Sequence, residues 1–188
     1  MIEIIASVLW LIQWVLIMMN KRSNRIFYVL QMVFLVIFSY FAKLYWDMWL
    51  DLLYIWFGIV WYISRWKKES KIEKLSNKNL LLIIWLWMIA TFVVYFILKA
   101  SNDVLPVMDS ITTVISVIAT VLMVRRKLES WIFWLIWDIL YCIQYLILPD
   151  IALYLFILNL IWTALAIVTY IQWYKEMKQY DWNVALAA

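Results

Sequence analysis

Residues 80–98 read LLLIIWLWMIATFVVYFIL, a run of nineteen residues without a charge. A helix that crosses the hydrocarbon core of a bilayer needs about 20 predominantly apolar residues. Polar segments flank the run, because residues 65–79 are rich in Lys, Glu, Ser and Asn and Lys99 follows directly. The stretch therefore predicts a transmembrane helix, and the remaining sequence contains similar runs.

Six further apolar runs bring the number of predicted spans to seven. They cover residues 2–19, 26–42, 45–64, 106–124, 131–148 and 151–174. Runs of this length that are apolar on all sides favour helices, because barrel strands alternate over about ten residues. The first run lacks a preceding basic segment and a small-residue cleavage site, so we do not expect a cleaved signal peptide. The predicted fold class is an all-α integral membrane protein with seven transmembrane helices.

The composition agrees with this class and excludes several others. Hydrophobic residues make up 69% of the 188 residues, and charged residues 15%. There is no His, one Cys (Cys142) and one Gly (Gly58). His-based catalysis, a zinc site, an internal disulfide and a glycine-rich phosphate loop are therefore excluded. We expect no cofactor, no metal and no enzymatic activity.

The basic residues predict the orientation of the chain. Of the sixteen Lys and Arg residues, all but Lys43 and Lys99 follow the first, third, fifth and seventh spans. Cytoplasmic loops carry such an excess of positive charge. We therefore expect a multi-pass protein of the cell membrane with its N-terminus outside and its C-terminus in the cytoplasm. This bias also accounts for the net charge of +4, so nucleic-acid binding is not indicated.

The spans group as three, one and three, and this grouping predicts four segments. They are a first three-helix repeat (1–66), a cytoplasmic loop with linking helix (67–105), a second three-helix repeat (106–174) and a cytoplasmic tail (175–188). One span between the triplets gives both the same direction, as in transporters with parallel repeats. Within the tail, we expect residues 181–188 to be disordered.

Several polar side chains lie inside the predicted spans, where an acid at the bilayer centre costs about 2.5–3.5 kcal/mol on insertion scales. Asp138 and Asn159 are close to mid-depth, and Asp51 lies within the third span. Asp109 is near the outer end of its span, where snorkelling or helix capping is the favoured explanation. For Asp138, a hydrogen bond between helices is the alternative to substrate binding.

Five side chains form a stripe along one face of the sixth span. They are Trp131, Trp134, Asp138, Tyr141 and Tyr145, at intervals of three and four residues. Aromatic stripes of this kind usually belong to a core or to an interfacial belt, but the acid within the stripe departs from both. Aromatic faces attract cations, and a carboxylate adds a complementary charge. The stripe therefore favours a site for a flat, cationic, hydrogen-bonding ring.

Residues 108–138 (MDSITTVISVIATVLMVRRKLESWIFWLIWD) resemble the PnuC family of nicotinamide riboside transporters. The resemblance rests on an Asp-Ser opening, a Ser-rich helix, a basic turn and the spacing Trp-x-x-Trp-x-x-x-Asp that ends at Asp138. Residues 42–54 (AKLYWDMWLDLLY) resemble the third helix of the family. The similarity extends over nearly the whole chain.

The resemblance implies uptake of a small cationic vitamin or vitamin precursor, foremost nicotinamide riboside, by facilitated diffusion. The triplets would rock against each other to expose the site alternately to either face of the lipid bilayer. A cytosolic kinase would act downstream on the substrate, and homo-oligomerisation stays open. The implied site would consist of Trp131 and Trp134 as stacking rings, Asp138 as hydrogen-bond partner, Asp51 and Asn159 opposite, and Tyr141, Tyr54 and Asp109.

Departures from the family pattern leave the substrate open. Members usually carry Asn where this chain has Asp138, often Gln where it has Asp51, and Tyr where it has Asn159. An ionised Asp only accepts hydrogen bonds, which suits an amine or a hydroxyl group. Thiamine, which carries an amino group and is the substrate of PnuC-like carriers within the family, is the alternative. A non-transporting membrane subunit is the alternative of another class.

Overall fold

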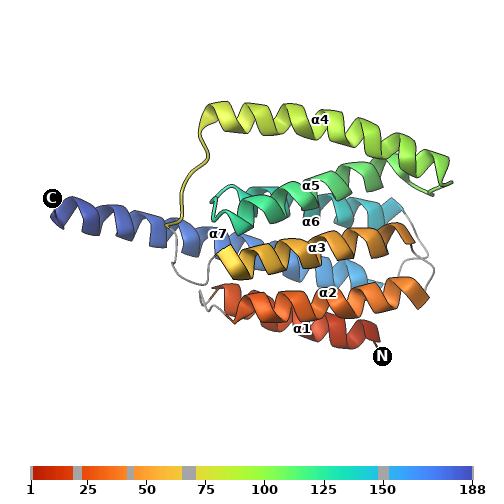
Figure 1. Ribbon diagram of the computed structural model, residues 1–188, viewed down its shortest axis with the longest axis horizontal. Coiled ribbons are helices and arrows are strands. Elements are labelled where there is room, and N and C mark those ends of the chain that lie inside the picture. Colours follow the sequence, from red (N-terminus) through yellow and green to blue (C-terminus); the bar gives the residue numbers. More distant parts are fainter. Residues whose placement is uncertain (1, 19–22, 42–44, 65–70, 148–152, 188) are drawn as a thin grey trace. The chain divides into compact units, whose positions relative to one another are not determined.

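The computed structural model describes residues 2–18, 23–41, 45–64, 71–147 and 153–187, and their regular structure is helical apart from one isolated bridge between Glu73 and Lys127 (Figure 1). Contacts divide the chain into two compact units, Met1–Ser70 and Lys71–Ala188. The described residues form seven helices: α1 (Ile2–Met18), α2 (Asn24–Phe41), α3 (Tyr45–Ser64), α4 (Asn77–Ala100), α5 (Pro106–Val124), α6 (Ser130–Ile147) and α7 (Leu153–Ala187).

In the first unit, α2 packs against both α1 and α3. Tyr28 of α2 meets Trp61 of α3 edge to face, with ring centroids 6.3 Å apart, and both rings are buried. Arg25, at the start of α2, lies over the same Trp61 ring at 5.4 Å. Gly58 of α3 lies against the Tyr28 ring, so the missing side chain lets the two helices approach closely.

This contact predicts that Gly58→Ala destabilises the protein. A Cβ atom at Gly58 would lie 2.8 Å from Cδ1 of Tyr28 and 2.8 Å from Cγ2 of Val29. Overpacking of this kind costs about 1–3 kcal/mol, against a gain in helix propensity of about 1 kcal/mol. Because the buried Tyr28 ring is held by Trp61, we expect a lower melting temperature in detergent. Ile59→Ala, at the adjacent exposed position, should change it less, and an unchanged or raised value for Gly58→Ala would contradict the packing.

In the second unit, α4 packs against α5, α5 against α6, and α6 against α7. The hydroxyl-rich face of α5 is buried and satisfied within the helix. Thr112 donates to the carbonyl of Met108 at 3.0 Å, and Thr120 donates to that of Ser116 at 2.8 Å. The buried face of α5 therefore includes small side chains whose hydroxyls bond their own helix backbone.

Among the described residues, four helices are long and apolar enough to cross a membrane, namely α2, α4, α5 and α6. The most apolar is α4, with a mean hydropathy of 2.6 and Leu98 as its buried residue. Shorter apolar stretches occur at Val8–Ile17 in α1 and Met48–Ile63 in α3. The predicted all-helical class with membrane-spanning helices is confirmed, while seven spans in two parallel repeats stay a prediction.

The expected disorder over residues 181–188 is wrong, because α7 continues to Ala187. The buried face of the helix includes Trp173 near the end of the apolar run and continues beyond the run to Met177. Further along, Asp181 forms an ion pair with Lys71, and this hydrogen bond raises the pKa of the Lys71 amine above its usual range. The tail therefore continues α7 and contacts a residue far away in the sequence.

Candidate functional site

Asp138 is the ninth of the eighteen residues of α6 and is 2% exposed. Its Oδ2 atom is buried and has no hydrogen-bond partner among the described residues. A buried carboxyl oxygen without a hydrogen bond lowers the stability of the folded protein, so its presence calls for an explanation. The geometry leaves this oxygen able to accept a hydrogen bond from a bound molecule.

Asn159 of α7 contacts Asp138 through the main chain. Its Nδ2 atom donates to the backbone carbonyl of Asp138 at 2.5 Å and lies 3.4 Å from Sγ of Cys142. These bonds tie α7 to α6 at the depth of Asp138 and do not use its carboxyl group. The structure thus brings the two residues together, and the Asn159 side chain links α7 to α6.

A ladder of aromatic rings runs along α6 beside Asp138. Trp134 meets Trp137 at 5.7 Å between centroids, Trp137 meets Tyr141 at 4.3 Å, and Tyr141 meets Tyr145 at 5.8 Å. The stripe predicted from the sequence omitted Trp137, although it lies three residues after Trp134 and four before Tyr141. Nε1 of Trp134 is buried without a hydrogen-bond partner among the described residues, so the ladder holds a second unused polar atom.

Trp131 lies at the start of α6 and is 1% exposed. Its ring packs edge to face against Trp173 of α7, with centroids 5.2 Å apart. Arg126 lies over the other ring of this pair, 5.3 Å from the centroid of Trp173. Sequence reasoning missed Trp173 and Arg126, because nothing in local spacing relates them to Trp131. A ligand can stack on Trp131 only in a conformation that uncovers its ring.

Asp109, in the first turn of α5, belongs to a separate polar pair. It accepts a hydrogen bond of 2.8 Å from Nε2 of Gln144, which is 8% exposed. Because Gln144 follows Asp138 by six residues, the pair lies about 9 Å further along the axis of α6. Asp109 is therefore placed apart from Asp138 and joins α5 to α6.

Asp51 and Tyr54 both belong to α3 in the first unit. Oδ2 of Asp51 accepts a hydrogen bond of 3.3 Å from the hydroxyl of Ser39 in α2. Tyr54 is buried. Their position opposite Asp138 stays a prediction.

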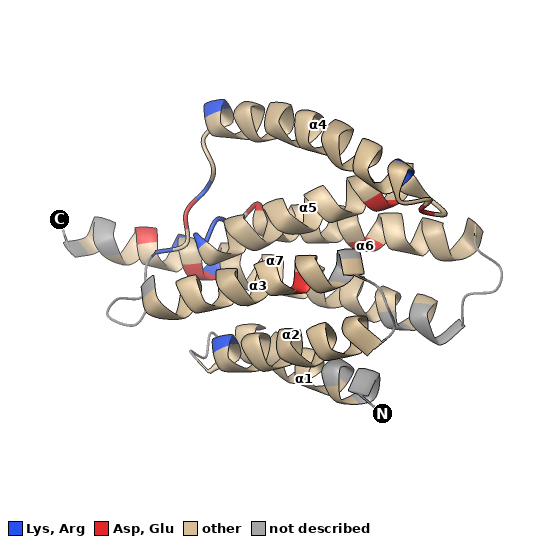
Figure 2. Cartoon of the chain, turned by 45° about the vertical axis from the view of Figure 1, so that its right-hand side comes forward, with Lys and Arg blue, Asp and Glu red and all other residues tan. Residues whose placement is uncertain are grey.

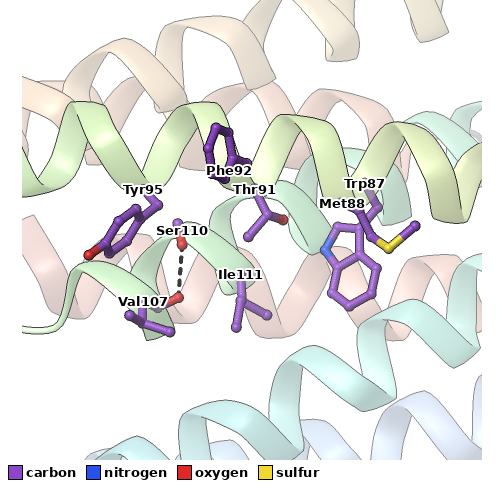
Figure 3. A pocket seen from close by; sticks show the side chains of 8 residues that line it. All are labelled: Trp87, Met88, Thr91, Phe92, Tyr95, Val107, Ser110 and Ile111. Carbon is purple, nitrogen blue, oxygen red and sulfur yellow. Dashed lines mark hydrogen bonds between the residues drawn. The ribbon is translucent and has the colours of Figure 1, made fainter.

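A cavity of about 420 Å³ lies between α4 and α5 and contains none of the predicted site residues (Figure 3). Three of its lining side chains, Thr91, Tyr95 and Ser110, carry a hydroxyl group, and the Ser110 hydroxyl donates to the carbonyl of Val107 at 2.8 Å. The cavity contains aromatic rings but no charged side chain, so it offers a cationic molecule no counter-charge of the kind that Asp138 provides. Its eight lining residues are Trp87, Met88, Thr91, Phe92, Tyr95, Val107, Ser110 and Ile111.

Basic side chains of the second unit gather at the end that holds the α5–α6 turn (Figure 2). This turn carries Arg125, Arg126 and Lys127, while Lys99 lies at the end of α4 that leads into α5. Acidic residues pair with two of these basic side chains, Glu176 with Arg126 and Glu73 with Lys127. Within the described ranges, no group of three or more Cys, Asp or Glu side chains could hold a metal ion.

Comparisons with known proteins relate the chain to vitamin transporters. The profile of a family described as nicotinamide mononucleotide transporter matches residues 1–175. The nicotinamide riboside transporter PnuC of Neisseria mucosa is 27% identical over 193 residues, covering 94% of this chain and 73% of that protein. A crystal structure of the vitamin B3 transporter PnuC matches with a TM-score of 0.76 and 26% identity, covering 93% of this chain and 81% of that one.

Proposed function

Because the chain belongs to the nicotinamide mononucleotide transporter family, we propose that it takes up nicotinamide riboside by facilitated diffusion. Members of this family are transporters, so the chain is a membrane transporter and not an enzyme. The substrate is proposed from the relative in Neisseria mucosa and from the vitamin B3 transporter of similar fold. A cytosolic kinase that phosphorylates the substrate would lower its free concentration inside the cell and so keep its concentration gradient directed inward.

One observation carries the assignment of the binding site, namely the unused Oδ2 of Asp138 at the middle of α6. The ribosyl hydroxyls or the carboxamide N–H of nicotinamide riboside can donate to this oxygen. The pyridinium ring is a flat cation, which suits the faces of Trp134 and Trp131. Asp51 and Tyr54 would contribute from the first unit, and Tyr141 from the ladder.

The transport mechanism is proposed as alternating access between two three-helix repeats. The repeats cover residues 1–66 and 106–174, and residues 67–105 link them through α4. The basic residues around the α5–α6 turn support a cytoplasmic position for that end, with the N-terminus outside. Since Gly58 is the single glycine, rigid rocking of the repeats is favoured over local unwinding of a helix.

Thiamine is the second candidate, and the identity of residue 138 favours it. Asp accepts hydrogen bonds, whereas the Asn that is usual in the family both accepts and donates. The aminopyrimidine of thiamine offers an N–H donor to this acceptor, and its thiazolium ring is also a flat cation.

Calorimetric titration of the purified protein with nicotinamide riboside, thiamine, riboflavin and deoxyadenosine tests the proposal. We expect binding of nicotinamide riboside, with thiamine weaker by at least about tenfold, or 1.4 kcal/mol. Tighter binding of thiamine would make thiamine the substrate and leave the assignment of the binding site unchanged. Binding of none of the four would contradict the transport function and favour a membrane subunit that carries no substrate.

A further inference from the structure

The backbone of Arg126 is left-handed, with a φ of 53°. It follows the last turn of α5 in a Schellman motif, in which the N–H of Lys127 bonds the carbonyl of Leu122 and the N–H of Arg126 bonds that of Met123, both at 2.9 Å. Glycine is the usual residue at this position because it has no Cβ. An arginine here occupies an unfavourable conformation, so its side chain requires an explanation.

The Arg126 side chain is 8% exposed and contacts both Glu176 and Trp173. Its Nη2 atom lies 3.0 Å from Oε1 of Glu176, and the guanidinium lies over the Trp173 ring at 5.3 Å. Trp173 in turn meets Trp131 edge to face. We call these three layers, Arg126, Trp173 and Trp131, the cation–indole stack.

The turn that carries Arg126 is held in place by residues 71–75. The N–H of Glu73 donates to the carbonyl of Arg126 at 3.1 Å, and the N–H of Leu128 donates to that of Glu73 at 3.0 Å. Lys127 pairs with the carboxylate of Glu73 at 2.6 Å. The guanidinium therefore projects from a fixed backbone onto Trp173.

We infer that Arg126 is a positioning residue for the substrate, because the cation–indole stack sets the orientation of the Trp131 ring. The inference rests on the proposed function, in which Trp131 stacks on the vitamin. Positive charge at the end of a cytoplasmic turn is a simpler role, but Arg125 supplies that charge from an exposed position with an ordinary φ of −83°. Charge alone therefore does not explain an arginine in the glycine position.

The test compares Arg126→Gly with Arg125→Gly, which removes the same charge from the same turn. Both are reconstituted in proteoliposomes, and KM and the maximal rate are measured for nicotinamide riboside, with the melting temperature measured without substrate. We expect Arg126→Gly to raise KM about tenfold, because the Trp173 ring loses the cation that holds it against Trp131. Its melting temperature should stay near that of the wild type, since glycine suits the left-handed backbone. Arg125→Gly should leave KM unchanged.

Arg126→Lys provides a second variant, because it keeps the charge and the backbone while it loses the planar guanidinium. It should raise KM severalfold at an unchanged melting temperature, and this result decides the matter if Arg126→Gly does not fold. Wild-type KM in both variants, or a fall in melting temperature with KM unchanged, would overturn the positioning role alone. A wild-type protein that does not transport nicotinamide riboside would instead overturn the proposed function, and the inference with it.

Discussion

Asp138→Ala is expected to weaken the binding of nicotinamide riboside by about 10- to 150-fold, because a hydrogen bond to a charged group contributes about 1.5–3 kcal/mol. The melting temperature of the unliganded protein should be unchanged or higher. The variant removes a buried Oδ2 atom that has no partner among the described residues, and it keeps the main-chain carbonyl that bonds Asn159. Titration calorimetry and thermal unfolding in the same detergent give both quantities.

This pair of measurements separates a ligand group from an interhelical bond. If the Asp138 carboxyl group served to hold α6 to a neighbouring helix, Asp138→Ala would lower the melting temperature and leave the affinity of the folded protein intact. Asp138→Asn is the matched control, since it keeps the shape and changes the donor pattern. Retained binding of nicotinamide riboside in Asp138→Asn, together with weaker binding of thiamine, would agree with the proposed substrates.

Trp131→Ala is expected to cost about 3–5 kcal/mol of unfolding free energy, which is typical when a buried indole is removed. Trp131 is 1% exposed and packs against Trp173, so its loss leaves a cavity beneath the cation–indole stack. Binding should also weaken, because one face of the proposed stacking site disappears. Equilibrium unfolding in detergent measures the first effect and titration the second.

Trp134→Ala is the matched control for this variant, because it removes the same side chain one turn further along α6. Trp134 is only partly buried, and its ring contacts Trp137 within the same helix. Its substitution should therefore cost clearly less stability while it still weakens binding. Equal losses of stability at both positions would contradict the distinction between a buried Trp131 and a more accessible Trp134.

Helix boundaries were predictable where strong local signals flank the apolar run. The predicted spans 45–64 and 106–124 coincide with α3 and α5. Pro106 suits the first turn of a helix, and a basic triplet follows Val124. At 24–26 and 77–80 the signals conflict, because polar residues precede the apolar run. There α2 and α4 begin two and three residues before the predicted starts.

Only those relations in the candidate site that lie within a single helix were predictable from the sequence. Periodicity places Trp134, Asp138 and Tyr141 on the same side of α6, since that relation is local. The bond from Asn159 to the main chain of Asp138 depends on how α7 packs on α6. The contact between Arg126 and Trp173 depends on a left-handed turn and on a helix about fifty residues away. Apolar periodicity contains no information about either relation.

Counterflow in proteoliposomes tests the proposal that a site around Asp138 carries nicotinamide riboside without an energy source. Vesicles loaded with unlabelled nicotinamide riboside are diluted into labelled nicotinamide riboside, without ATP and without an ion gradient. We expect transient accumulation of label with the wild-type protein and almost none with Asp138→Ala. Absence of accumulation with the wild type, or equal accumulation with both proteins, would contradict the proposal.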